Sequence, residues 1–121
     1  MAKKEEKYPH PEQLKLYEKL IATIPVIEKK GAAIPYTSQN GNMFSYMADD
    51  GTLAQRLPEG AREKFLEKYN TRLRVAYGIV QKEYVVVPFG LLANTAELKP
   101  YMQQSWEYVQ KLKAKPPKKN N

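Results

Sequence analysis

Two alternating segments around an Asp-Gly pair constrain this chain more than any other feature. Residues 43–48 read MFSYMA and residues 53–57 read LAQRL, with Asp50 and Gly51 between them. An Asp-Gly pair between alternating apolar segments is typical of a β-hairpin, because a type I′ turn needs positive φ at both central residues. The segment therefore predicts a hairpin.

A two-residue turn at Asp50-Gly51 also predicts the pairing of the two strands. It sets Ala48 opposite Leu53 and Phe44 opposite Leu57. Because side chains alternate along a strand, one face of the first strand would carry Phe44, Tyr46 and Ala48, and the other Met43, Ser45 and Met47. On the second strand, Leu53, Gln55 and Leu57 would share a face.

The remaining elements follow from apolar periodicity and turn signals. The pair Asn40-Gly41 is a second turn signal, which predicts a three-stranded meander over residues 33–58. Apolar residues three or four apart predict helices over residues 11–24, 58–69 and 91–113, and alternating or β-branched runs predict strands over residues 71–78 and 79–88. The order α-β-β-β-α-β-β-α predicts an α+β fold, in which helices pack on an antiparallel sheet of about five strands.

Length and charge predict one domain with basic ends. A chain of 121 residues fits a single core, which we expect over residues 11–112, with a flexible leader at 1–10 and a basic disordered tail at 113–121. Residues 1–7 and 111–121 carry eight lysines against two glutamates, which accounts for six of the seven net positive charges. The net charge therefore does not indicate a nucleic-acid-binding face on the folded part.

The composition favours a cytoplasmic protein. The sequence contains no Cys, which excludes disulfides, thiol nucleophiles and Cys-ligated metals. Its first residues lack the apolar stretch of a signal peptide, and no window is long and apolar enough to predict a membrane span.

Three groups of side chains are candidates for binding. Hydroxyl, amide and guanidinium groups could form a ligand rim at Tyr36, Thr37, Ser38, Asn42 and Arg56, although such clusters more often stabilise turns. An anion or nucleic acid could contact Arg72, Arg74 and Lys82, unless these residues form a solvated sheet face paired with Glu83. A partner or a second copy could contact Tyr101, Trp106 and Tyr108, whose helical spacing is equally typical of core packing.

Catalytic signatures are not found in the sequence. The pair Asp49-Asp50 is interpreted as a solvated hairpin tip, and the single histidine, His10, as an exposed terminal residue. Phosphate-binding glycine loops, helical His-Glu-x-x-His and Gly-x-Ser-x-Gly are absent. We therefore expect no catalytic residue, no metal, no cofactor and no enzymatic activity.

The amino-acid sequence of the middle of the chain resembles the N-terminal domain of the TfoX/Sxy family of small bacterial proteins. Three segments carry the resemblance: residues 40–69, KEYVVVP at 82–88, and the closing stretch LLANTAELKPYMQQSWEYV at 91–109. The resemblance implies a secretion-chaperone-like α+β fold of the YgaC/TfoX-N type and a role in regulation. The family's glycine-rich opening is here GAAIPYT at 31–37, and no catalytic residue can be carried over.

Three hypotheses for function follow from these observations. The first is a non-enzymatic interaction or regulatory module, acting through an unknown protein partner or as a homodimer. The second is a nucleic-acid-binding regulatory protein, which needs a continuous basic patch on one sheet face. The third is a small-ligand-binding domain that uses the polar segment 36–42, which needs a concave pocket with convergent polar groups.

Overall fold

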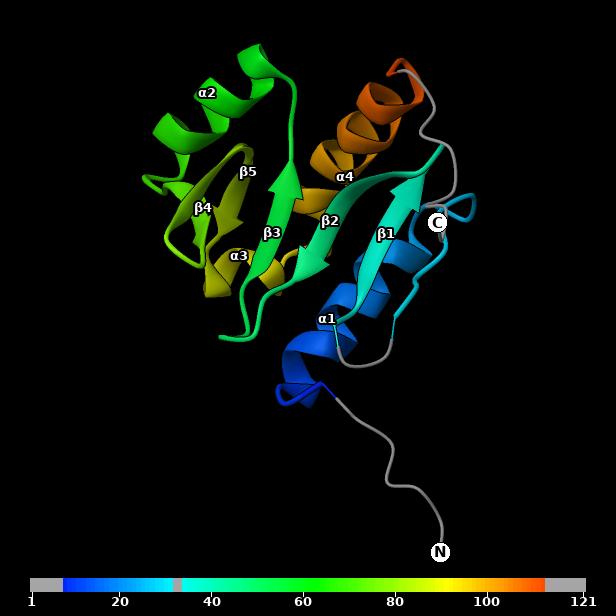
Figure 1. Cartoon of the computed structure of the whole chain (residues 1–121). Helices are drawn as coiled ribbons and strands as arrows, with labels where there is room; N and C mark the ends of the chain where they lie inside the picture. Colours follow the sequence, from blue (N-terminus) through cyan, green and yellow to red (C-terminus); the bar gives the residue numbers. More distant parts are fainter. Residues whose placement is uncertain (1–7, 32–33, 113–121) are drawn as a thin grey trace, which may run out of the picture.

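The computed structural model describes residues 8–31 and 34–112. In chain order the elements are α1 (Pro11–Ala22), β1 (Tyr36–Gln39), β2 (Asn42–Met47), β3 (Leu53–Arg56), α2 (Glu59–Lys68), β4 (Leu73–Ala76), β5 (Ile79–Val87), α3 (Phe89–Leu92) and α4 (Thr95–Gln110) (Figure 1). The strands form one antiparallel sheet in the order β1-β2-β3-β5-β4. The predicted α+β class with a five-stranded antiparallel sheet is confirmed.

The predicted closing helix is divided into two. The short helix α3 ends at Leu92, and α4 begins after Asn94, whose side-chain oxygen accepts a hydrogen bond from the Glu97 backbone N–H at 3.2 Å. A side chain that satisfies one of the free N–H groups in the first turn is a typical N-cap. The Asn at the start of the predicted helical stripe is therefore a helix boundary.

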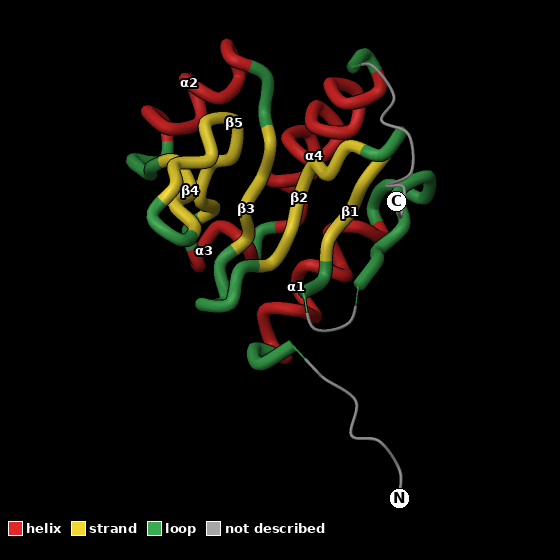
Figure 2. The backbone as a smooth tube through the Cα atoms, viewed as in Figure 1, coloured by secondary structure: helices red, strands yellow, loops and turns green. Residues whose placement is uncertain are grey.

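One face of the sheet carries the main core. Tyr17 of α1, Phe65 of α2 and Met102 of α4 are buried there against Leu53 and Val85 of the sheet. Figure 2 shows α1 and α4 behind β1, β2 and β3, with no described helix across the opposite face of these strands. We call this opposite side the open face.

A small cluster occupies the open face instead of a helix. Tyr46, Ala48 and Ala54 are buried in it, and Tyr36, Met43 and Tyr84 pack against it while partly exposed. In the sheet, Ala54 of β3 lies between its partners Tyr46 and Val86. The small Ala54 side chain is fully buried within this cluster.

The predicted register of the β2–β3 hairpin is wrong by one residue. Met47, not Ala48, pairs with Leu53, and Ser45 pairs with Gln55. The loop has three residues: the Gly51 N–H bonds the Ala48 carbonyl at 3.1 Å, and Gly51 has φ +89°. This geometry is a turn followed by a left-handed glycine, a common alternative to the two-residue turn. A slip of one residue exchanges the two faces of a strand, so Met47 faces the core and Ala48 the open face.

A β-bulge corrects part of that exchange. Thr37 of β1 pairs with Ser45 of β2, but the next residue, Ser38, pairs with Met43, which leaves Phe44 as the extra residue. The bulge returns Phe44 to the core side, with Leu57, and Met43 to the open face, as the predicted pairing of Phe44 with Leu57 implied. Tyr46 and Ala48, which were predicted to share a face with Phe44, lie on the open face instead. The prediction that Leu53, Gln55 and Leu57 share a face is correct, since all three are buried on the helix side.

The end of the predicted leader is part of the fold. Tyr8 is buried, and its hydroxyl donates to the carbonyl of Ala48. His10 Nε2 lies 2.8 Å from the Asp49 carbonyl, and its ring packs edge-on against Tyr8. The other residues predicted as leader and tail, 1–7 and 113–121, lie outside the described residues.

Candidate binding surface on the open face

The open face contains a hollow of about 700 Å³. Side chains of β2, β4 and β5 line it, together with Ile34 from the segment before β1. Its walls are mostly apolar, with Met43, Tyr46 and Ile79 among them, and the charged and amide groups are Asp49, Arg74 and Gln81. An apolar concavity with a few polar groups is the usual composition of a binding site. We call it the open-face hollow.

An apolar hairpin tip borders the open-face hollow. Val75, Ile79 and Val80 are 47%, 68% and 48% exposed, and Tyr77 is fully exposed. Val75 and Val80 form a cross-strand pair, and Tyr77-Gly78 is the turn of the β4–β5 hairpin. We call these four residues the hairpin tip.

Tyr77 has an unfavourable backbone conformation at this turn. It has φ +54° and Gly78 has φ +75°, as in a type I′ turn. The other described non-glycine residues with positive φ are Asn40 and Asn70, and asparagine tolerates this region well. A fully exposed tyrosine with positive φ gains no packing within the chain to offset the strain. Such an outlier is a reason to consider function at this position.

The charged groups of the hollow are loosely paired. Arg74 lies 3.8 Å from an Asp49 oxygen and 3.7 Å from an Asp50 oxygen, and its Nε is 3.3 Å from the Tyr46 hydroxyl. The Arg74 side chain is 16% exposed, whereas that of Asp49 is 91% exposed. Partial burial alone would raise the pKa of Asp50, but hydrogen bonds from Thr52 and the charge of Arg74 lower it below its usual value. The Asp50 carboxylate is therefore ionised beside the guanidinium at neutral pH.

The predicted ligand rim does not converge on one cavity. Tyr36 packs on the open face, whereas the Thr37 hydroxyl is buried on the helix side, 2.5 Å from Ser45 Oγ. Ser38 accepts a hydrogen bond from Lys30 at 3.0 Å, and Asn42 is buried with its amide 3.2 Å from the Asn40 carbonyl. The alternation of β1 separates these groups, which act mostly in turn and core contacts.

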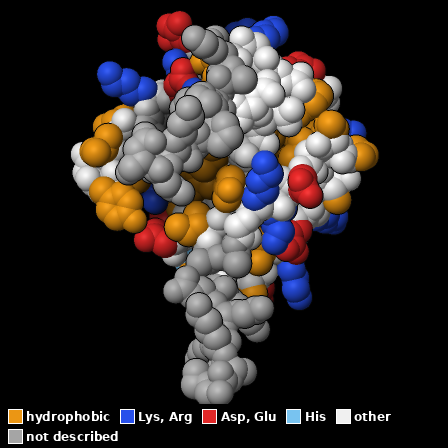
Figure 3. Space-filling model, turned by 45° about the vertical axis from the view of Figure 1, so that its right-hand side comes forward, with side chains coloured by type: hydrophobic (Ala, Val, Ile, Leu, Met, Phe, Trp, Pro, Cys, Tyr) orange, Lys and Arg blue, Asp and Glu red, His pale blue; other side chains and the backbone are white. Residues whose placement is uncertain are grey.

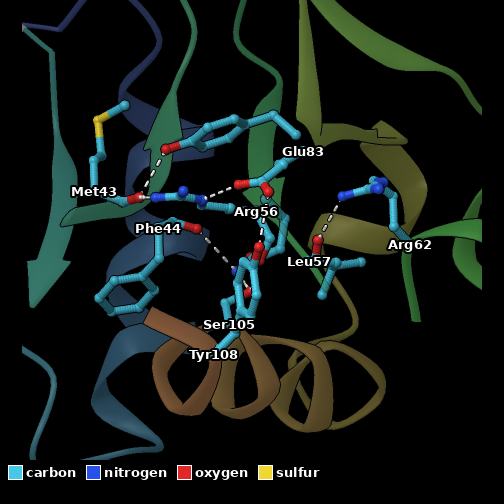
Figure 4. A network of polar contacts seen from close by, with 10 residues as sticks. Met43, Phe44, Arg56, Leu57, Arg62, Glu83, Ser105 and Tyr108 are labelled. Carbon is cyan, nitrogen blue, oxygen red and sulfur yellow. Dashed lines mark hydrogen bonds and ion pairs between the residues drawn. The ribbon is translucent and has the colours of Figure 1, made fainter. Parts of the chain in front are cut away.

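Arg56, the fifth rim residue, belongs to a network that joins the sheet to α4 (Figure 4). Its Nε is 2.7 Å from a Glu83 oxygen, and another nitrogen donates to the Met43 carbonyl at 3.1 Å. Tyr108 of α4 donates to the second Glu83 oxygen at 2.7 Å, and its ring lies 5.6 Å from the guanidinium. The Ser105 hydroxyl donates to the Arg56 carbonyl. This arrangement holds α4 against the end of β3.

The residues predicted for anion or nucleic-acid contact do not gather into a basic patch with Arg56. Arg56 and Arg74 have carboxylate partners, whereas Arg72 and Lys82 are exposed. On the side shown in Figure 3, basic and acidic side chains are interspersed. The nucleic-acid hypothesis needs a continuous basic surface, and these positions do not supply one.

The aromatic residues of α4 face inward in part. Tyr101, Trp106 and Tyr108 are half-buried and pack against the main core. The ring centroids of Tyr101 and Phe65 are 4.9 Å apart, and the Trp106 indole nitrogen is buried without a hydrogen-bond partner. Their role as an interface stays a prediction, and packing accounts for the contacts they make.

Clusters of metal-ligating side chains are not found in the described part of the chain. Residues 8–31 and 34–112 contain no group of three or more His, Asp or Glu side chains placed to share a metal ion. In the same residues, no helix has both the length and the apolar character that a membrane crossing requires. The open-face hollow is thus the main chemical feature left to explain.

Sequence reasoning missed most of the residues that form this surface. Neither Met43, Tyr46 and Gln81 in the hollow nor Tyr77 and Ile79 at the tip were candidates. The stretch VAYGIV at 75–80 carried a signal, because an apolar run across a Gly-containing turn leaves bulky side chains at a position that normally takes small polar residues.

Comparison with known proteins identifies no relative. No protein-family model, no curated protein and no solved structure matches the chain.

Proposed function

We propose that this protein is a non-enzymatic interaction module that binds another polypeptide through the open face of its sheet. The observation that carries the proposal is the hairpin tip beside the open-face hollow. Exposed apolar groups gathered around a concavity are typical of interaction sites, whereas apolar residues scattered singly are not. The partner would insert an apolar side chain into the hollow and cover the tip.

The polar groups of the hollow favour a specific, oriented contact over a purely apolar one. Arg74, Asp49 and Gln81 offer donors and acceptors at the edge of an apolar site. In protein interfaces a few such groups set orientation, while the buried apolar residues supply most of the binding energy. A partner segment with one large apolar residue next to a polar or charged group fits this arrangement.

The resemblance to TfoX N-terminal domains gives further support. That family implies a small regulatory domain with helices on a sheet, and a regulatory role requires a partner surface rather than catalytic groups. On this proposal the finer fold is secretion-chaperone-like, and the protein acts in the cytoplasm as a bacterial regulator.

A small apolar ligand is the second candidate, because about 700 Å³ lies within the range of ligand pockets. Of the hairpin tip, Val80 lies outside the hollow, and Tyr77 is fully exposed although it lines the hollow. A polypeptide can cover tip and hollow together, so it accounts for more of this exposed surface than a small ligand does.

The test uses a random peptide library displayed on phage and selected against the immobilised full-length chain. We expect enriched peptides that share a large apolar residue and lose affinity about tenfold or more on the variant Tyr77→Asn. The matched control is Val26→Asn, which alters an exposed apolar residue, 59% accessible, in the turn after α1. If no peptide is enriched on chains immobilised as monomers, or if binding is indifferent to Tyr77, the proposal fails.

A further inference from the structure

The binding surface on the open face is shaped to fit itself. The hairpin tip is a protrusion, with Tyr77 fully exposed at its end, and one side of the tip, with Val75, Tyr77 and Ile79, forms a wall of the open-face hollow. In a two-fold dimer the same patch contacts itself, so it must contain both a protrusion and its receptor. Tyr77 borders the hollow of its own chain, which is the placement that a reciprocal exchange of side chains across a two-fold axis requires.

The charges of the surface are also self-complementary. Arg74 supplies a guanidinium, and Asp49 and Asp50 supply carboxylates, one of them almost fully exposed. The distances of 3.7–3.8 Å exceed the length of a charge-assisted hydrogen bond, so the exposed Asp49 carboxylate can accept a closer donor. A two-fold axis that passes between Arg74 and the carboxylates sets the positive group of one copy opposite the negative groups of the other, so like charges do not face each other.

The apolar area fits the scale of a dimer. Full burial of one aromatic side chain removes roughly 150–250 Å² from water, and Tyr77 offers all of its surface. Val75, Ile79 and Ile34, which also line the hollow, add about half or more of theirs. These residues and the other walls of the hollow supply a part of the roughly 800 Å² per partner of a standard interface.

We propose that the occupant of the open-face hollow is a second copy of this chain, whose Tyr77 enters the hollow while its own hollow receives Tyr77 in return. The inference rests on the proposed function and names its partner. It also explains why a tyrosine occupies this position with positive φ, because the left-handed turn projects the ring away from its own chain and toward the neighbour.

The first experiment is sedimentation equilibrium of the full-length chain over a wide concentration range. It is run at about 150 mM salt, where screening limits the repulsion between two chains of net charge +7. We expect a monomer–dimer equilibrium for the unmodified chain and for Val26→Asn. For Tyr77→Asn we expect the dissociation constant to rise about tenfold or more. Circular dichroism checks that each variant is folded.

The second experiment locates the contact. A photoreactive benzoylphenylalanine replaces Tyr77, and light and isotope-labelled copies are mixed before irradiation. We expect crosslinks between a light and a heavy chain, from position 77 to residues 43–49 of the other copy. Crosslinks confined to one chain, or to α4 of the other, would overturn the inference.

The outcomes separate this inference from the proposed function. A chain that stays monomeric at every concentration refutes the second copy as occupant. If selected peptides still bind to it and depend on Tyr77, the interaction module stands with a different partner. If peptides also fail to bind, both proposals are refuted. A dimer that Tyr77→Asn does not weaken refutes the assigned surface.

Discussion

Single residues differ in how well they suit the backbone conformation of the turn in which they lie. Asn40 and Gly41 occupy positive φ at the β1–β2 turn, as the sequence predicted for an Asn-Gly pair. Tyr77 and Gly78 adopt the same geometry at the β4–β5 turn, but a tyrosine there is strained and fully exposed. Asn40 suits its turn and so serves folding, whereas Tyr77 does not suit its turn, and we assign it to binding.

The variant Tyr77→Asn should therefore stabilise the fold while it weakens binding. Asparagine is several-fold enriched at positive φ, which corresponds to about 0.5–1 kcal/mol of extra unfolding free energy. Urea unfolding at a concentration where the chain is monomeric measures it. A variant less stable than the unmodified chain would show that Tyr77 packs within its own fold.

Glu83 gives the fold a dependence on pH. Partial burial would raise the pKa of its carboxyl, but hydrogen bonds from Tyr108 and Arg56 outweigh burial and hold the pKa below its ordinary value of 4.5. A group with a lowered folded-state pKa stabilises the protein above its unfolded pKa, and the stabilisation is lost as pH falls through the folded pKa. The network at the end of β3 should thus weaken in acid.

The variant Glu83→Gln tests this effect. At pH 7 we expect a loss of about 1–2 kcal/mol of unfolding free energy, since the carboxylate is partly exposed and makes charge-assisted hydrogen bonds. The loss should stay constant down to about pH 5 and shrink below about pH 4. Urea unfolding across this range measures it, with Glu63→Gln on the exposed side of α2 as control. A loss that is independent of pH would assign the effect to shape and not to charge.

At the scale of elements, the existence of each strand was easier to predict than its register. The β2–β3 hairpin was expected from Asp50-Gly51, and the hairpin is present. The number of loop residues depends on the conformation of one glycine, and the bulge at Phe44 depends on which side chain fills the core beneath α1 and α4. Neither is a local property of the sequence, so the prediction that Phe44, Tyr46 and Ala48 share one face was wrong.

The β2–β3 turn should not tolerate a side chain at Gly51. Its φ is +89°, and an added Cβ would lie 3.2 Å from the His10 ring. We expect Gly51→Ala to lose about 1–2 kcal/mol of unfolding free energy. Gly60→Ala in α2 is the matched control, because its Cβ meets nothing within 4 Å, and it should be neutral or slightly stabilising. Equal effects of the two substitutions in urea unfolding would contradict the assigned turn.

At the scale of the whole molecule, the order of elements predicted the fold class but not the site. The order of helices and strands required an antiparallel sheet with helices, and the structure has one. The open-face hollow joins Ile34, β2, β4 and β5. These segments are distant in sequence, so only the folded chain brings their side chains together.

The central claim is that the open face binds a polypeptide, and amide chemical shifts test it most directly. The full-length, isotope-labelled chain is titrated with the strongest selected peptide, and separately concentrated by itself. We expect shifts at residues 43–49 and 74–81, while the indole N–H signal of Trp106 on α4 stays in place. Shifts centred on α4, or none in either titration, would contradict the claim.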